Sequence, residues 1–334
     1  MYRSLIQLRN VFYDRGWIQS LHAKVPIISI GNLSVGGTGK TPITIMIAQL
    51  MNELHLPVSL LSSGYGRKTK GEFFLLKEGR IQSDILPEFV GDEPYLHALT
   101  GLYHQVIVNK PKSASIHQFT TPVLIDDGFQ HRAIARDIDI VLVNEHDLND
   151  RVLPFGKLRE PLTSLHRADI VVCTDHTPHS AFSSYMHEQA LFLRTETIPL
   201  APCLLSDFYL HTEYPFTQNI KESVMALAGI ANPDRFLQTL LSNGFNISHH
   251  HWLKDHVTFT PTMVNKICQE AKLHHCNTIV ITSKDAVKLH QYSSLFASHD
   301  ITVYYLPIAT VCIEGKLQLS ERIQTICTSF FQST

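Results

Sequence analysis

The sequence predicts an α/β fold in which a parallel sheet carries helices on both faces and a smaller C-terminal α/β domain follows. Short apolar runs alternate with helical patterns as far as about residue 200, and a related rhythm continues beyond that point. Such alternation is typical of parallel βαβ units, whose strands are buried on both faces. The chain has 334 residues, more than one core usually fills, which favours two domains.

The expected strands coincide with the apolar runs, and the expected helices lie between them. In the first domain we expect strands within 24–31, 57–64, 105–109, 122–128, 137–144 and 168–173, and helices over 42–55 and 93–101. In the second domain the pattern predicts strands within 223–230, 277–285 and 301–307, and a helix that begins near Asn232 and Pro233.

The predicted domain organisation has three parts. They are an amphipathic N-terminus over 1–24, a first domain over 25–205 and a second, smaller domain over 206–334. The boundary lies within 200–222, where prolines flank short extended pieces. The last helical stretch, 320–331, is expected either to complete the second domain or to return to the first.

Composition and charge exclude several classes of protein. The net charge is −2 and no long block of one sign occurs, so the basic footprint of a nucleic-acid-binding protein is absent. The six cysteines form no C-x-x-C pair and no secretory signal opens the sequence, which predicts a reducing, cytoplasmic environment. No apolar run reaches the ~18 residues typical of a spanning helix, and no obligate protein partner is indicated.

The first 24 residues interleave aromatic and aliphatic side chains with Arg3, Arg9, Arg15 and Lys24, opposed by Asp14 alone. Basic and apolar residues at helical spacing are typical of an interfacial helix on anionic lipid. A helix that packs on the protein's own core has a similar pattern. The residues alone leave both interpretations open.

A nearly complete phosphate-binding motif, S-V-G-G-T-G-K-T, lies between a predicted strand and a predicted helix, the context that such a loop requires. The glycines let backbone N–H groups converge on phosphate oxygens, while the lysine reaches the β- and γ-phosphates and the threonine ligates Mg²⁺. Serine replaces the first glycine of the consensus, and the alternative is a glycine-rich turn without a ligand. The predicted nucleotide-binding residues are Ser34, Val35, Gly36, Gly37, Thr38, Gly39, Lys40 and Thr41.

Asp126 and Asp127 follow the apolar run V-L-I at the end of another predicted strand. A carboxylate in this place beside a phosphate loop typically holds Mg²⁺ in P-loop enzymes. A polar turn that merely ends a strand has the same pattern. We expect a P-loop NTPase-like fold that binds ATP and Mg²⁺, with Thr41, Asp126 and Asp127 as the magnesium site.

Asp92 lies in V-G-D-E-P, just before a predicted helix. Its side chain could cap that helix. A helix start near the phosphates is also a suitable place for the base that activates an alcohol nucleophile. The residues leave both roles open, and the 20 histidines show no convincing metal-site spacing.

Eight segments occur in the order and spacing of the tetraacyldisaccharide 4′-kinase family: GNLSVGGTGKTP, SGYGRK, GDEP, IDDGFQHR, LPFGKLREPL, GIANPDRF, DHVTF and TSKDAVKL. The chain resembles this family from about residue 25 to 289, and GNLSVGGTGKTP and IDDGFQHR are the most specific segments. Ser34 is also the small residue that the family tends to carry at the first loop position.

The resemblance implies transfer of the γ-phosphate of ATP to the 4′-hydroxyl of a tetraacyl glucosamine disaccharide 1-phosphate, giving lipid IVA in lipid A biosynthesis. It implies peripheral contact with the cytoplasmic face of the inner membrane of a Gram-negative bacterium, through the N-terminus. It also implies that Asp92 is the catalytic base, His256 its partner and Lys40 a phosphate ligand. Matching cleft positions are Tyr65, Glu93, Gln130, His131 and Arg159.

Three positions depart from the family pattern: Ser63, Lys254 and Ser283 replace its usual arginine, proline and glutamate. The contacts at these positions are left open. A P-loop switch ATPase is an alternative, but it carries a lysine where this chain has Val35 and lacks a second domain with D-H-V-T-F. A P-loop kinase for a soluble sugar or nucleoside would leave the basic, aromatic N-terminus without a role.

Overall fold

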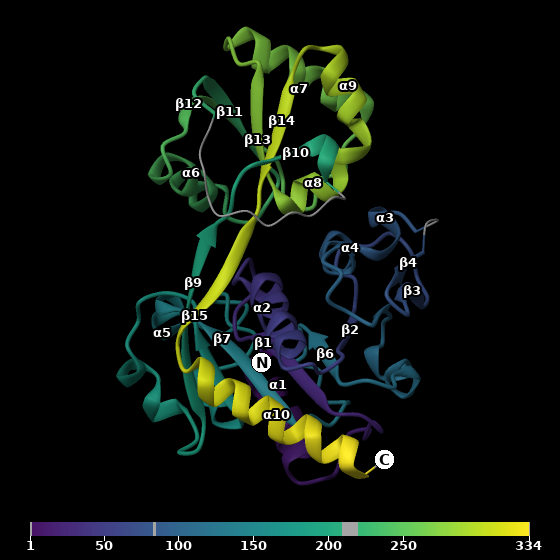
Figure 1. Cartoon of the computed structure of the whole chain (residues 1–334). Coiled ribbons are helices and arrows are strands. Elements are labelled where there is room, and N and C mark those ends of the chain that lie inside the picture. Colours follow the sequence, from purple (N-terminus) through teal and green to yellow (C-terminus); the bar gives the residue numbers. More distant parts are fainter. Residues whose placement is uncertain (1, 83–84, 209–219, 334) are drawn as a thin grey trace.

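The computed structural model of the chain describes residues 2–82, 85–208 and 220–333. It shows two α/β units, with the smaller above the larger and two long strands running between them (Figure 1). The last helix, α10 (Lys316–Ser333), lies beside the larger unit.

The larger unit contains, among the described residues, one ten-stranded sheet in the order β15–β9–β8–β7–β1–β6–β2–β5–β3–β4. The strands from β9 to β5 run parallel, whereas β15, β3 and β4 pair antiparallel at the two edges. The strands are β1 (Ile27–Asn32), β2 (Ser59–Ser62), β3 (Phe73–Lys77), β4 (Arg80–Ile81), β5 (Gln105–Val108), β6 (Val123–Asp126), β7 (Ile138–Val143), β8 (Ile170–Cys173), β9 (Leu191–Pro199) and β15 (Ile308–Glu314).

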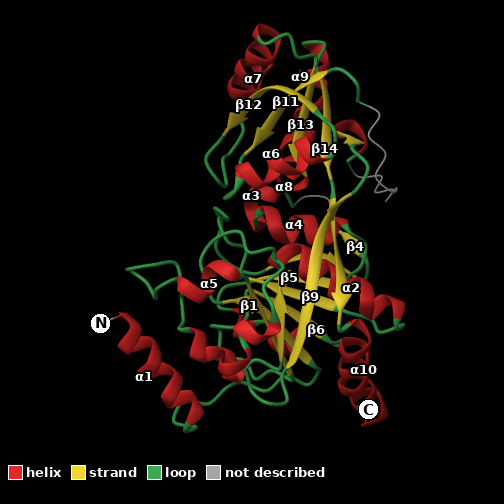
Figure 2. Ribbon diagram, turned by 90° about the vertical axis from the view of Figure 1, so that its left-hand side faces the viewer, coloured by secondary structure: helices red, strands yellow, loops and turns green. Residues whose placement is uncertain are grey.

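Helices flank this sheet, with α1 and α5 on one side and α2 and α10 on the other in Figure 2. The α-helices are α1 (Tyr2–Asp14), α2 (Lys40–Glu53), α3 (Pro87–Val90), α4 (Asp92–Leu99), α5 (Glu145–Asn149) and α10. Short 3₁₀ helices are η1 (Lys112–Ala114), η2 (Ile116–Gln118), η3 (Leu162–Arg167), η4 (His179–Ala181) and η5 (Ser183–Tyr185).

The smaller unit has a five-stranded sheet in the order β10–β14–β13–β11–β12, antiparallel only at β10. Its strands are β10 (Cys203–Leu204), β11 (Ser223–Ala228), β12 (Asn246–Trp252), β13 (Thr278–Thr282) and β14 (Thr302–Leu306). Its helices are α6 (Pro233–Ser242), α7 (Pro261–Leu273), α8 (Ser283–Leu289), α9 (Ser293–Ser298), η6 (Leu205–Asp207) and η7 (His290–Tyr292). As predicted, α6 begins beside Asn232, whose side chain caps it.

The strands β9 and β15 carry the chain between the two units. They pair antiparallel, with Pro199 opposite Ile308, so β9 leads out of the larger unit and β15 leads back. Residues 308–333 therefore lie with the larger unit, as β15 and α10. The domain limits given by the sequence stay a prediction, and residues 209–219, near the predicted boundary, lie outside the described residues.

The order of the central strands brings the predicted site together. β1 and β6 are parallel neighbours, with Ile30 opposite Asp126, and both are buried throughout because branched aliphatic residues dominate them. Parallel neighbours end at the same edge of a sheet. The glycine-rich loop after β1 therefore meets the two aspartates at the end of β6.

Helix α1 leaves both of its leucines exposed to solvent. Leu5 and Leu8 are 57% and 51% exposed, whereas Asn10 is buried and donates to Glu160 Oε2 at 2.7 Å. A helix that served the core would bury its leucines and expose its asparagine. These leucines therefore do not pack on the protein's own core. Within the described ranges, no helix is long and apolar enough to cross a membrane.

Candidate active site

The loop between β1 and α2 has the backbone of an anion site. Gly36 and Gly39 adopt left-handed conformations with φ of 116° and 86°. The first turn of α2 offers N–H groups that have no intrahelical acceptor. Its N-cap residue is Gly39, so no side chain at that position caps them. Ser34 is not among the described residues with positive φ, so its position does not require glycine. The loop can therefore hold phosphate as the motif predicts.

Two cations and a carboxylate gather at this loop. Lys40 Nζ lies 3.2 Å from Asn32 Oδ1 and 3.6 Å from Asp127 Oδ1. Arg159 donates to both oxygens of Asp127, at 3.0 and 2.9 Å, and also to Asn32 Oδ1. Burial opposes ionisation of Asp127, but the hydrogen bond from Arg159 and the charge of Lys40 outweigh it and hold the pKa of the carboxyl far below its usual value.

Asp126 offers the oxygen that a cation would need. Its Oδ1 is buried without a hydrogen-bond partner, while its Oδ2 accepts from Ser62 Oγ at 3.2 Å. Burial raises the pKa of this carboxyl, against the charge of Lys112. An unpaired carboxylate oxygen beside the phosphate loop fits Mg²⁺, which prefers oxygen ligands. The described residues contain no preformed group of three metal-ligating His, Cys, Asp or Glu side chains, so phosphate oxygens and water would complete the shell.

Lys112 is a buried cation that the sequence did not single out. Its Nζ donates to the carbonyl oxygens of Asp126 and Asp127, the latter at 2.8 Å. Asp127 has left-handed backbone, with φ of 52°, a conformation that costs energy in a residue other than glycine. Lys112 therefore holds the turn that presents both aspartates.

Asp92 and His256 come from different units and meet between them. Asp92 begins α4 of the larger unit, and His256 lies between β12 and α7 of the smaller one. His256 Nδ1 is 3.5 Å from Asp92 Oδ2, and Lys288 Nζ of α8 is 3.3 Å from the same oxygen. The N-cap residue of α4 is Gly91, and no side chain caps the helix. The capping role that the sequence left open for Asp92 is therefore wrong.

Helix α8 supplies the positive charge around Asp92. Burial opposes ionisation of Asp92, but the neighbouring imidazole of His256 and the charges of Lys288 and Lys284 outweigh it and hold the pKa of its carboxyl below the usual value. Lys284 Nζ also lies 3.5 Å from Glu93 Oε1 and 3.4 Å from His256 Nε2. The predicted base is thus a carboxylate held by cations of the opposite unit.

Asp92, His256 and Lys288 line a pocket of about 190 Å³ between the units. Tyr65 is 75% exposed, and its ring lies edge-on to the imidazole of His256 with 5.4 Å between ring centroids. Lys68 comes from the same loop as Tyr65, and Phe259 and Tyr292 form part of the opposite wall. Aromatic walls with a carboxylate, an imidazole and lysines suit a hydroxyl-bearing, anionic ligand.

The end of β2 links this pocket to the phosphate loop. Ser62 ends β2 and donates to Asp126, while Tyr65, three residues later, lines the pocket. Three residues of extended chain span at most about 11 Å. The phosphate loop also faces the smaller unit, since a Cβ at Gly37 would lie 3.6 Å from Ala231 Cβ. The two halves of the site are therefore neighbours.

The other predicted cleft residues divide between these groups. Gln130 Nε2 donates to the carbonyl of Asn32 at 2.8 Å, beside the phosphate loop. Glu93 forms an ion pair with Lys284, which belongs to α8 of the opposite unit. Burial lowers the pKa of His131 to about 4, and among the described contacts none joins this side chain to Lys40 or Asp92. The charge of Lys112 also lowers this pKa, so His131 lies near the lysine that holds the two aspartates.

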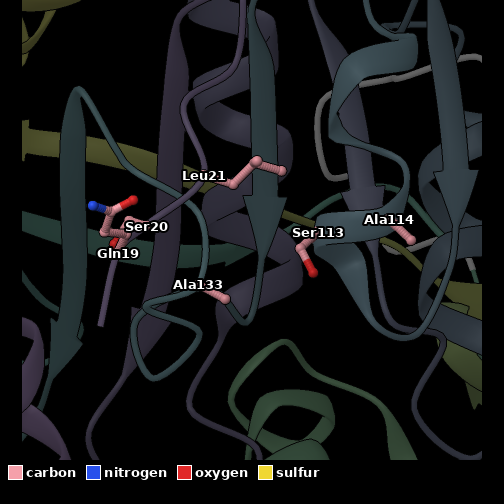
Figure 3. Close-up of a pocket in the computed structure, with 6 residues that line it drawn as sticks. All are labelled: Gln19, Ser20, Leu21, Ser113, Ala114 and Ala133. Carbon is pink, nitrogen blue, oxygen red and sulfur yellow. The ribbon is translucent and has the colours of Figure 1, made fainter. Parts of the chain in front are cut away.

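A larger hollow, of about 420 Å³, lies outside this cleft (Figure 3). Its lining has no charged side chain and consists of Gln19, Ser20, Leu21, Ser113, Ala114 and Ala133. None of these is a predicted site residue, and none is a usual acid or base. The predicted site residues therefore lie elsewhere, at the phosphate loop and in the pocket between the units.

Sequence reasoning missed four polar residues of the site. Asn32, Lys284 and Lys288 stand inside GNLSVGGTGKTP and TSKDAVKL, so the segments were recognised but these side chains were not. Lys112 lies just past the predicted strand 105–109. The shared edge of parallel strands was a signal that could have found it.

The glycine-rich loop, the two aspartates that end the neighbouring strand and the carboxylate–imidazole pair across the pocket define a P-loop phosphotransferase. A model of the tetraacyldisaccharide-1-P 4′-kinase family matches residues 1–328. The chain belongs to this family. The predicted family, the P-loop fold class and the assignment as a kinase are thereby confirmed.

Individual relatives match over most of their length. A tetraacyldisaccharide 4′-kinase of Desulfotalea psychrophila is 35% identical over 305 residues, which cover 88% of this chain and 87% of the relative. One of Aquifex aeolicus is 34% identical over 306 residues, covering 89% and 90%. A solved structure from Aquifex aeolicus, described as an apo form of LpxK in complex with ATP, has a TM-score of 0.75 and 30% identity, covering 98% of this chain and 96% of that one.

Proposed function

We propose that the chain transfers the γ-phosphate of ATP to the 4′-hydroxyl of a tetraacyldisaccharide 1-phosphate. The observation that carries this proposal is the contact of Asp92 with His256 across a pocket that adjoins the phosphate loop. The relatives are named for a tetraacyldisaccharide 4′-kinase. A solved relative holds ATP, which supports ATP as the donor.

On the donor side, the backbone of loop 34–39 and Lys40 bind the phosphates. Lys40 and Arg159 pair with Asp127 in this structure, which places both cations where they can turn to phosphate oxygens. Thr41, Asp126 and Asp127 would hold Mg²⁺, which would supply neutralisation of phosphate charge during the transfer. Lys40 contributes most where negative charge increases as the γ-phosphoryl group leaves.

On the acceptor side, Asp92 accepts the proton of the hydroxyl as the alcohol attacks. The lowered pKa of Asp92 makes its carboxylate a poor final holder of this proton. His256 can take the proton in the tautomer whose Nδ1 carries no hydrogen, since this atom lies 3.5 Å from Asp92 Oδ2. Because His256 and Lys288 belong to the smaller unit, the base is complete only when the two units meet.

A transfer assay tests the reaction. Purified protein is incubated with γ-labelled ATP, Mg²⁺ and tetraacyldisaccharide 1-phosphate in detergent, with the 4′-deoxy lipid as the matched control. We expect label on the lipid and none on the 4′-deoxy compound. Label on a soluble sugar or nucleoside, with none on the lipid, would contradict the proposal and favour a soluble-substrate kinase.

We also propose that α1 rests on the cytoplasmic face of the inner membrane. The exposed Leu5, Leu8 and Trp17 supply apolar area, and Arg3 and Arg15 are exposed among them. Such a surface suits an interface with anionic headgroups.

Replacing Leu5 and Leu8 together with serine is expected to weaken binding to anionic vesicles while ATP binding is unchanged, because only outward-facing apolar area is lost. Vesicle co-sedimentation measures the effect, and high salt should weaken binding further by screening. The control replaces Leu273 and Leu317, which are 75% and 77% exposed in other helices, with serine. Equal vesicle binding by both double variants would contradict the proposed contact.

A further inference from the structure

The loop between α5 and Leu158 presents one aromatic side chain to solvent. Phe155 is 83% exposed, more than any other described large hydrophobic residue on the surface. Single exposed apolar residues are common, so exposure alone carries no conclusion. The inference rests instead on three further features of the loop: its rigidity, its charge and its position next to α1.

The loop is held in shape from within. Asp150 accepts hydrogen bonds from the backbone N–H groups of Arg151 and Lys157 at 2.7 and 3.0 Å. The backbone N–H of Phe155 donates to Val152 O at 3.2 Å. There is no room for a side chain at the position after Phe155, since a Cβ there would lie 2.2 Å from Asp150 Oδ1. A ring on such a preordered loop loses little entropy when it binds.

Two basic residues flank the ring. Arg151 and Lys157 are both exposed, and among the described residues neither side chain forms an ion pair. The nearest carboxylate in the loop, that of Asp150, is already engaged by two backbone N–H groups. An aromatic residue between free cations complements an anionic lipid surface, where the ring enters the headgroup region and the cations stay in water.

The loop ends where α1 docks. Asn10 of α1 donates to Glu160, two residues beyond Leu158, and α1 lies on the same side of the larger unit as α5, away from α10 (Figure 2). Leu158 also forms a β-bridge with Ser34 of the phosphate loop. A membrane contact of this loop would therefore fix the phosphate loop relative to the bilayer.

We propose that Phe155 is a second membrane contact, whose ring enters an anionic bilayer interface while Arg151 and Lys157 bind headgroups. This inference rests on the proposed membrane contact of α1. It adds that the surface is held at two points, α1 and loop 150–158, so that the active site keeps a fixed height above the lipid.

The first test replaces Phe155 with serine in the full chain and measures co-sedimentation with vesicles of phosphatidylglycerol and phosphatidylethanolamine. We expect roughly tenfold weaker binding, because the ring's apolar area no longer leaves water. The control Leu273→Ser should bind as wild type, and the KM for ATP should be unchanged in both. Unchanged vesicle binding by Phe155→Ser, with binding lost in the Leu5 and Leu8 variant, would overturn this inference and leave the contact of α1 intact.

The second test places tryptophan at position 155, with Trp17 and Trp252 replaced by phenylalanine. Anionic vesicles should shift its emission to shorter wavelength, and brominated lipids should quench it. An unshifted spectrum on vesicles that bind the protein would overturn the proposal. So would a raised KM of Phe155→Ser for micellar lipid with unchanged vesicle binding, which would assign the ring to the substrate. The transfer assay in micelles tests the kinase function separately.

Discussion

Replacing Lys40 with alanine is expected to abolish phosphate transfer while the protein stays folded. Lys40 Nζ reaches Asn32 and Asp127 at the phosphate loop, where it can bridge β- and γ-oxygens as charge develops on them. Loss of one such preorganised group typically costs about 10²–10³ in turnover. We expect at least that loss, measured as the rate of label transfer at saturating ATP.

The fold should tolerate this change because Asp127 keeps its two hydrogen bonds from Arg159. Thermal unfolding checks this point. The matched control is Lys316→Ala, which removes a lysine from an exposed ion pair with Glu53 and should leave turnover unchanged. Near wild-type turnover of Lys40→Ala at saturating ATP would show that loop 34–41 is not the donor site.

The second large effect is expected at Asp92. Replacing it with asparagine should lower turnover by roughly 10²–10⁴-fold, the usual scale for a removed general base. Asparagine has nearly the same size as aspartate, but its amide cannot take the proton of the acceptor hydroxyl. The control is Glu88→Gln, which changes an exposed carboxylate on the rim of the same pocket and should leave turnover nearly unchanged.

The pairing of Asp92 with His256 predicts that their losses do not add. If the proton passes from one to the other, a variant with Asp92→Asn and His256→Ala should be only slightly slower than the worse single variant. Transfer rates of the four proteins, measured at saturating substrates, give the answer. Full additivity, or normal turnover of His256→Ala, would mean that the two residues act separately.

The meeting of the glycine-rich loop with the two aspartates could be predicted because its signals are local. The glycine-rich loop, Lys40 and Thr41 lie in one segment, and Asp126 and Asp127 end a recognisable strand. Parallel strands share an edge, so these pieces had to meet. Serine is compatible with the first position of the loop, because the backbone of Ser34 is not left-handed and does not require glycine.

Contacts between segments that are distant in the sequence could not be predicted. Hydrophobic periodicity identifies a strand but not its partner, so the pairing of β9 with β15 and the return of residues 308–333 could not be derived. The approach of Lys288 to Asp92 depends on how the two units meet, which no periodicity encodes. Whether Asp92 caps its helix also needed the structure, because the same residue type serves as a cap and as a base.

The most direct test of the whole account is a structure of the protein with a non-hydrolysable ATP analogue, Mg²⁺ and the acceptor lipid. We expect the 4′-hydroxyl within about 2.6–3.2 Å of the Asp92 carboxylate and in line with the γ-phosphorus, with Lys40 turned from Asp127 to the phosphates. An acceptor hydroxyl bound away from Asp92, or a triphosphate outside loop 34–41, would contradict the claim that transfer takes place between the two units.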